Sequence, residues 1–257
     1  MIDLEAALRK RLEAGGRTFV PYVTGGFPGA DADLLHALQD AGADAVEVGI
    51  PFSDPVMDGG VIQEASRRAL QAGAHPADIL ELIADAGLSI PVVVMTYVNP
   101  VYRRGFEAFA RDAVEAGVAG IIVPDLPVDE ASEWLATCRK HDVASVLLAS
   151  PNTAPDRLAR IADEARGFVY CVASYGVTGA REELAATARE VVSALRPLTD
   201  RPLLVGVGVA TPAQAAQACE FADGVIVGSA IMARLLEGDR NGAGRLASAF
   251  RESIPGV

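Results

Sequence analysis

A carboxylate stands inside an otherwise apolar segment of the chain, Ala45–Ile50, and two more follow it closely. Apolar neighbours penalise the ionised form of Glu47 and raise its pKa, so that this carboxyl group can give and take a proton near neutral pH. Asp54 and Asp58 stand among prolines and glycines typical of a loop. A single buried glutamate is more often held by hydrogen bonds beside capping aspartates, but three carboxylates at one strand exit favour acid-base chemistry.

The lysines, histidines and cysteines argue against other chemistries. Neither lysine, Lys10 or Lys140, falls at a strand end, so we expect no Schiff-base lysine for an aldolase or for pyridoxal phosphate. The histidines lie in or beside predicted helices, which disfavours a metal centre or a His-based catalytic pair. The cysteines have no CxxC spacing, and we expect buried, reduced thiols. These residues are His36, His75, His141, Cys138, Cys171 and Cys219.

Polar side chains follow several of the predicted strands. They are Tyr22, Thr24, Tyr97, Asn99, Tyr102, Asp125, Ser150, Asn152, Tyr170 and the segment SYGVTGA from Ser174. This set favours proton transfer without a cofactor or metal. Asp125 stands between two prolines, and we expect it to brace a loop rather than to move protons.

The last quarter of the chain contains glycine-rich segments after three consecutive strands. Backbone amides at such turns, and at a helix N-terminus, bind phosphate without a lysine. One glycine of this kind would indicate only a tight turn, but three loops that converge favour a phosphate site. The residues expected to form it are Gly179, Gly208, Gly228 and Ser229.

Short β-branched runs alternate with amphipathic stretches along the whole chain, a pattern typical of an α/β protein. The predicted strands are Phe19–Thr24, Ala45–Gly49, Val92–Thr96, Gly120–Val123, Ser145–Leu148, Phe168–Val172, Leu203–Gly206 and Val225–Val227. Eight such strands indicate a (β/α)8 or TIM barrel in one domain, residues 1–257. A doubly wound open sheet is the main alternative, but VTGGFPGAD after the first strand lacks its glycine fingerprint.

Two segments are additional to the eight strands and eight helices of a minimal barrel. Leu4–Ala14 is predicted to form an extra N-terminal helix that plugs the N-terminal face of the barrel. The long interval from Gly49 to Val92, an insertion after the second strand, has room for the carboxylate loop and two helices.

Charge and composition exclude several classes of function. The formal net charge is −12, which repels nucleic acid and anionic membranes. The apolar runs are too short to span a membrane, and the acidic start does not resemble a signal peptide. We therefore expect a soluble cytoplasmic protein that binds a small molecule.

Several motifs together resemble the tryptophan synthase α subunit family over nearly the full length. They are FVPYVTGGFPG (Phe19–Gly29), VEVGIPFSDPVMDG (Val46–Gly59), MTYVNP (Met95–Pro100), GIIVPDLP (Gly120–Pro127), YGVTGA (Tyr175–Ala180), VGVGVATP and IVGSAI. The second is highly specific, whereas barrels and phosphate loops are shared by many enzymes. The resemblance implies retro-aldol cleavage of indole-3-glycerol phosphate to indole and glyceraldehyde 3-phosphate.

The resemblance also implies roles for individual residues. Glu47 is similar to the family's general acid-base group, and Asp58 to the aspartate that accepts the indole N–H. Tyr170 matches a tyrosine near that glutamate, while Tyr22 and Tyr102 are expected to flank the indole. The phosphate-binding positions of the family correspond to Gly179, Gly208, Gly228 and Ser229.

The resemblance implies an α2β2 complex whose β subunit carries pyridoxal phosphate and receives the indole; this chain itself is expected to hold no cofactor. Two alternatives stay open from the sequence. One is a free-standing indole-releasing lyase or another phosphate-binding barrel enzyme. The other is a non-catalytic subunit that only activates a β-type partner.

Overall fold

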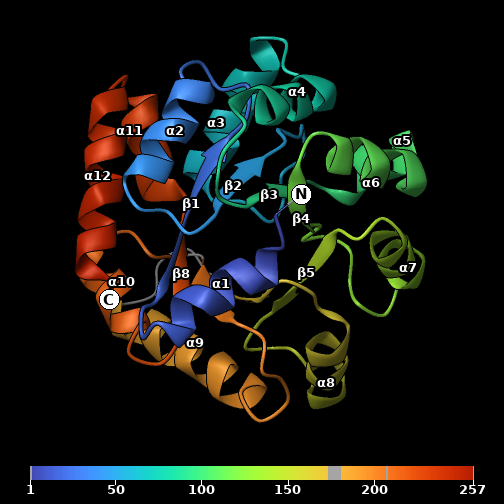
Figure 1. Ribbon diagram of the computed structural model, residues 1–257, viewed down its shortest axis with the longest axis vertical. Coiled ribbons are helices and arrows are strands. Elements are labelled where there is room, and N and C mark those ends of the chain that lie inside the picture. Colours follow the sequence, from blue (N-terminus) through green and yellow to red (C-terminus); the bar gives the residue numbers. More distant parts are fainter. Residues whose placement is uncertain (1, 173–180, 207, 257) are drawn as a thin grey trace.

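The chain closes into a barrel of eight parallel strands paired in chain order, with β8 beside β1 (Figure 1). A computed structural model describes residues 2–172, 181–206 and 208–256. The strands are β1 (Thr18–Thr24), β2 (Val46–Gly49), β3 (Val92–Met95), β4 (Val118–Ile122), β5 (Ala144–Ala149), β6 (Val169–Val172), β7 (Leu203–Gly206) and β8 (Gly224–Val227). The predicted barrel is confirmed, with small differences at the strand ends.

Helices surround the barrel and connect its strands. They are α1 (Leu4–Glu13), α2 (Ala32–Asp40), α3 (Gly60–Gln71), α4 (Pro76–Ala86), α5 (Val98–Arg104), α6 (Phe106–Glu115), α7 (Ser132–Lys140), α8 (Pro155–Glu164), α9 (Arg181–Leu195), α10 (Pro212–Ala218), α11 (Ser229–Leu236) and α12 (Arg240–Ser253). The insertion after β2 contains a loop and the two helices α3 and α4, as predicted.

Helix α5 was not predicted, because its sequence, VNPVYRR, has a proline and no long apolar period. Pro100 falls in the first turn of the helix, where its missing N–H is not needed for an intrahelical bond. In Figure 1 this short helix lies outside the barrel, beside α6.

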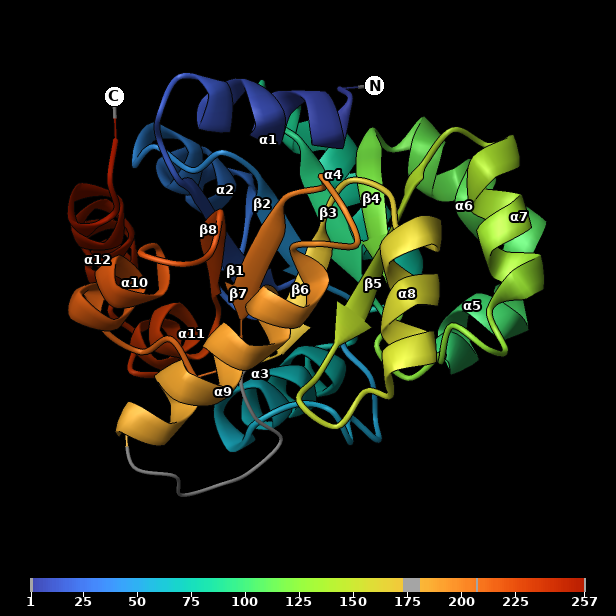
Figure 2. The same cartoon turned by 90° about the horizontal axis from the view of Figure 1, so that it is seen from below.

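Helix α1 closes the N-terminal end of the barrel, as predicted (Figure 2). Leu4 and Leu8 are 2% and 0% exposed and belong to an apolar cluster with strand residues such as Val93, and with Phe168 just before β6. In Figure 2, α1 lies across one end of the barrel and α3 lies at the opposite end. The interior is therefore sealed by apolar side chains at the α1 end.

Strand β4 begins at Val118 rather than at the predicted Gly120, and a contact with helix α1 explains why residue 120 is a glycine. A methyl group on Gly120 would lie 2.7 Å from Leu4 Cδ2, and one on Gly167 would lie 2.6 Å from it. Glycine inside a strand often marks such a close approach. Gly120 is thus a strand residue that makes room for Leu4 rather than the start of the strand.

A second apolar layer fills the space between the strands and the outer helices. Phe19 of β1 stacks on Phe250 of α12 at 6.1 Å between ring centroids, and Trp134 of α7 packs against Phe106 and Phe109 of α6. The cysteines of the described residues are buried free thiols, as expected. Within the described ranges, no helix has the length and apolar character needed to cross a membrane.

Truncation of the plug tests its contribution. We expect Leu8→Ala to lower the free energy of unfolding by about 2–5 kcal/mol, because it leaves a cavity in a fully buried layer. Urea unfolding measures this loss, and Lys10→Ala on the exposed face of the same helix is the matched control. Equal stability of the two variants would contradict the plug.

Candidate active site

A cavity of about 250 Å³ opens where the strands end at their carboxyl termini. It is lined by Tyr22, Glu47, Met57, Asp58, Gly59, Ile62, Met95, Tyr170, Gly208, Val209, Ala210, Ile226, Gly228 and Ser229. The structure therefore brings together most of the site residues expected from the sequence. In a barrel of this kind, reactive groups gather at this end.

Glu47 points into the barrel because of the strand register. It stands opposite Tyr22 of β1 and Val93 of β3, and its side chain is 1% exposed. Burial, and then the nearby charge of Asp58, raise the pKa of Glu47 from 4.5 to about 8. Within the described residues, Glu47 Oε2 has no hydrogen-bond partner. At neutral pH the carboxyl group is thus mostly protonated and able to donate.

Asp58 comes from the loop between β2 and α3. Burial raises the pKa of Asp58 from 3.8 to about 6, against the opposing effect of a hydrogen bond from Tyr97. Asp58 is therefore mostly ionised at neutral pH, whereas Glu47 is mostly protonated. Two carboxyl groups with separated pKa values in one cavity are typical of acid-base sites. Asp54 of the same loop is exposed and accepts a hydrogen bond from Ser53.

Two tyrosines lean across the barrel mouth over glycines of the neighbouring strands. A methyl group on Gly49 of β2 would lie 2.1 Å from the hydroxyl of Tyr22, and one on Gly206 of β7 would lie equally close to that of Tyr170. Burial and the charge of Asp58 hold the pKa of Tyr22 well above its usual value, so its phenol stays neutral. These glycines give the two rings room to flank the cavity.

The cavity is also lined by glycines and by the start of a helix. Gly208 has a φ of 92°, which favours glycine, and it is exposed. Ser229 is the first residue of α11, whose first intrahelical bond runs from Met232 N–H to the Gly228 carbonyl. The preceding amides of this helix are therefore not used within it, and such amides attract anions. The predicted Gly179 lies outside the described residues, as does the rest of 173–180.

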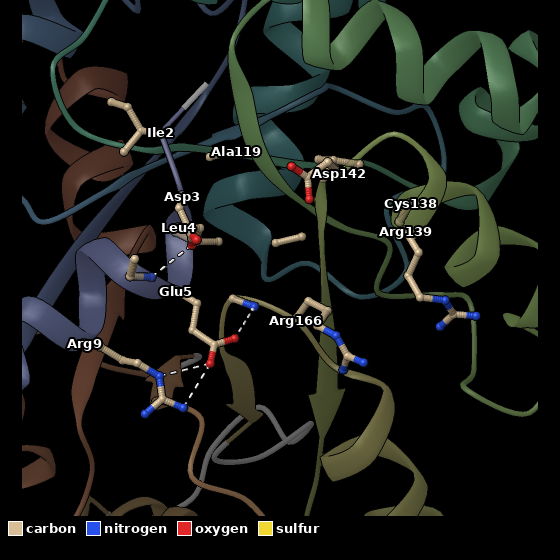
Figure 3. A pocket seen from close by; sticks show the side chains of 14 residues that line it. Ile2, Asp3, Leu4, Glu5, Arg9, Ala119, Cys138, Arg139, Asp142 and Arg166 are labelled. Atoms are coloured by element: carbon tan, nitrogen blue, oxygen red, sulfur yellow. Dashed lines mark hydrogen bonds and ion pairs between the residues drawn. The ribbon is translucent and has the colours of Figure 1, made fainter.

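A second hollow, of about 480 Å³, lies at the other end of the barrel beside α1 (Figure 3). Two of its charged groups, Glu5 and Arg9, pair with each other. Arg9 pairs with Glu5 at 3.0 Å, and Glu5 also accepts from the amide of Gly167. These contacts fasten α1 to the barrel, and we assign them to packing. Across the described ranges, no group of three or more His, Cys, Asp or Glu side chains is arranged to hold a metal ion.

Comparison with known proteins decides the family. The family model described as "Tryptophan synthase alpha chain" matches residues 8–252. The chain belongs to the tryptophan synthase alpha chain family.

Relatives across bacteria support this membership. The tryptophan synthase alpha chain of Oceanobacillus iheyensis is 42% identical over 98% of this chain and 96% of its own, and that of Streptomyces coelicolor is 45% identical over 90% and 86%.

Solved structures agree. A chain of Mycobacterium tuberculosis tryptophan synthase superposes with a TM-score of 0.90 at 38% identity, covering 98% of both chains. Tryptophan synthase subunit alpha of Legionella pneumophila gives 0.89 at 35% identity, again covering 98% of both. This chain is accordingly a lyase of tryptophan biosynthesis, the half of tryptophan synthase that cleaves indole-3-glycerol phosphate.

One expectation for this member of the tryptophan synthase alpha chain family needs correction. Tyr102 does not reach the cavity. It lies on α5, is 75% exposed, and meets Phe106 edge to face at 6.2 Å between ring centroids. The unpredicted helix α5 carries Tyr102 away from the barrel mouth.

Sequence reasoning singled out Tyr97 only as a polar strand-exit residue, yet its hydroxyl contacts Asp58. No local pattern in the sequence indicates this contact, because Asp58 lies on a different loop, 39 residues earlier in the chain. Asp125 braces a loop, as expected: its Oδ1 accepts from the amide of Val98 at 2.8 Å.

The raised pKa of Glu47 predicts a pH-dependent stability. The pKa of Glu47 is about 8 in the folded chain, above the ordinary value of 4.5. The stabilisation that comes from this proton is therefore complete below pH 4.5 and is lost as the pH rises through 8. Between pH 6.5 and 8 this group should reduce the free energy of unfolding by up to about 1.4 kcal/mol per pH unit.

Glu47→Gln removes this ionisation, so its stability should fall less steeply with pH than that of the native chain. Urea unfolding across this pH window measures the difference. Glu13→Gln, an exposed change on α1, should keep the native slope. Parallel curves for Glu47→Gln and the native chain would rule out the raised pKa.

Proposed function

We propose that Glu47 and Asp58 carry out the retro-aldol cleavage of indole-3-glycerol phosphate. The observation that carries this proposal is their meeting in one cavity with Gly208, Gly228 and Ser229, the first residue of α11. A buried carboxyl group supplies the proton, a second carboxylate supplies charge, and the amides supply a place for the phosphate.

Glu47 serves as the general acid and then as the base. Its protonated carboxyl group donates to C3 of the indole ring, which makes the ring an indolenine with a positive charge at nitrogen. The resulting carboxylate takes the proton from the hydroxyl group on the glycerol carbon attached to C3. The C–C bond then breaks, its electron pair restores the indole, and the glycerol carbon becomes the aldehyde. A pKa of about 8 suits a group that must donate and accept near neutral pH.

Asp58 stabilises the charge that develops during this cleavage. Its carboxylate accepts the hydrogen bond from the indole N–H, which grows stronger as the ring becomes positive. The pKa of about 6 keeps it ionised at neutral pH. Since the protonated ring is the electron sink, no lysine imine is needed. Both lysines lie elsewhere, Lys10 exposed on α1 and Lys140 paired with Glu107.

The rest of the cavity orients the substrate relative to Glu47 and Asp58. Tyr22 and Tyr170 flank the ring, and the amides around Gly208, Gly228 and Ser229 receive the phosphate. An anionic group needs such a local site because the formal net charge of the chain is −12.

We further propose that a tryptophan synthase β subunit docks beside this mouth and receives the indole in an α2β2 assembly. A groove of about 920 Å³ lies between the β2–α3 loop and helices α4, α5 and α6. Two of the elements that border it expose large apolar side chains, Val56 of the β2–α3 loop at 78% and Tyr102 of α5 at 75%. Exposed large apolar groups gathered at one place are typical of an interaction surface. Pyridoxal phosphate belongs to that partner, and we expect no cofactor in this chain.

An indole-release assay tests the catalytic proposal. The purified chain should release indole from indole-3-glycerol phosphate, and faster with a β subunit present. Glu47→Gln should lower the rate by about 10²–10⁴-fold because it removes the proton donor, while activation of the β subunit is retained. Glu13→Gln should match the native chain.

Normal cleavage by Glu47→Gln would remove Glu47 from the mechanism. Absence of cleavage by the native chain with a β subunit, but with activation of that partner, would identify a non-catalytic subunit. A rate unchanged by the β subunit would favour a free-standing lyase.

A matched pair of variants tests the phosphate site. We expect Ser229→Asp to raise KM for indole-3-glycerol phosphate at least about tenfold with little change in kcat, because the added charge opposes the phosphate without touching the reacting carbon. Ser229→Asn has nearly the same shape without the charge and should change KM far less. Equal KM values for the two variants in steady-state kinetics would place the phosphate elsewhere.

A further inference from the structure

One phenol holds the loop that carries Asp58. The hydroxyl of Tyr97 donates to Asp58 Oδ2 at 3.0 Å and accepts from the amide of Met57 at 3.0 Å. Both partners belong to the β2–α3 loop, whereas Tyr97 lies two residues after β3 and immediately before α5. The donor and acceptor capacities of the phenol are thus both used on adjacent residues of the loop.

Tyr97 is itself firmly placed. It is 2% exposed, and its ring stacks on Phe52 at 5.0 Å between centroids. The next amide, that of Val98, donates to Asp125 in the loop after β4. The segment that carries the phenol is therefore tied to a neighbouring loop, and a rigid support of this kind orients the group that it contacts.

The electrostatics of this contact favour an ionised Asp58. Burial and the charge of Asp58 raise the pKa of Tyr97 well above its usual value, so the phenol remains a neutral donor. The other titratable groups that face Asp58 are Glu47 of β2 and Tyr22 of β1, whereas α3 contributes the uncharged Gln63. Among the described neighbours, Tyr97 is the group whose side-chain hydrogen bond lowers the pKa of Asp58.

We propose that Tyr97 is a positioning residue that keeps Asp58 ionised and aimed into the cavity. Tyr97 does not line the cavity, so it acts through Asp58 rather than on the substrate. The consequence for cleavage rests on the proposed role of Asp58, but the hydrogen-bonded clasp of Tyr97, Asp58 and Met57 stands on its own geometry. An Asp58 without this donor would be protonated at higher pH and free to turn.

Tyr97→Phe tests the clasp because it keeps the ring and its stacking on Phe52 and removes only the hydroxyl. A ¹³C NMR titration of the Asp58 carboxyl group measures its pKa directly, without any turnover. We expect the pKa to rise by about one pH unit in this variant, since a hydrogen bond to a charged group is worth about that shift. The acid limb of kcat/KM should move to higher pH by the same amount, because activity is lost as pH falls through the pKa of Asp58.

Gln63→Ala is the matched control. Gln63 Nε2 donates to the backbone carbonyl of Asp58 at 2.9 Å, so it anchors the same loop without contacting the carboxylate. This variant should change KM and leave both the NMR titration and the acid limb in place. A general loosening of the loop therefore has a different signature from loss of the clasp.

An unchanged Asp58 titration in Tyr97→Phe would overturn the proposal, and so would an equal shift in Gln63→Ala. A shift in the NMR titration without lyase activity in the native chain would support the clasp and refute the proposed function.

Discussion

The burial of Glu47 inside the barrel is the constraint on which the site depends. A carboxyl group with 1% exposure keeps its proton at neutral pH only while water stays out of its surroundings. The strand register directs the side chain inward, and the apolar layer with Leu4 and Leu8 closes the space behind it. The packing of the whole barrel offsets the free energy that this burial costs. That packing includes helix α1, at the end of the barrel opposite the candidate active site.

The two acids differ in how firmly the fold holds them. Glu47 belongs to a strand paired on both sides, whereas Asp58 belongs to a loop and relies on side-chain contacts for its position. The glycines of β2 and β7 that face Tyr22 and Tyr170 set the room between these groups. Small residues at strand ends thus shape the cavity as much as the reactive residues do.

Much of the fold was predictable from the sequence because β-branched runs are a local signal. The glycine-rich loops and the acids could be brought together in advance because parallel strands end at the same face of a barrel. The sequence predicts a strand start at Gly120, because the reason for this glycine, the side chain of Leu4, lies in a distant segment. The family resemblance predicts Tyr102 beside the indole, and no local pattern corrects this, because α5 is short and contains a proline. The contact of Tyr97 with Asp58 is not predictable from the sequence, because the two residues lie on different loops.

The closure of the barrel by α1 has a further consequence for the path of small molecules. In the described part of the chain, α1 seals one end of the barrel and the cavity opens at the other, beside the loop that carries Asp58. An indole molecule that leaves by this opening passes the loop on which Val56 exposes its apolar side chain. A β subunit bound there, as proposed above, would take up indole before it diffuses into bulk water.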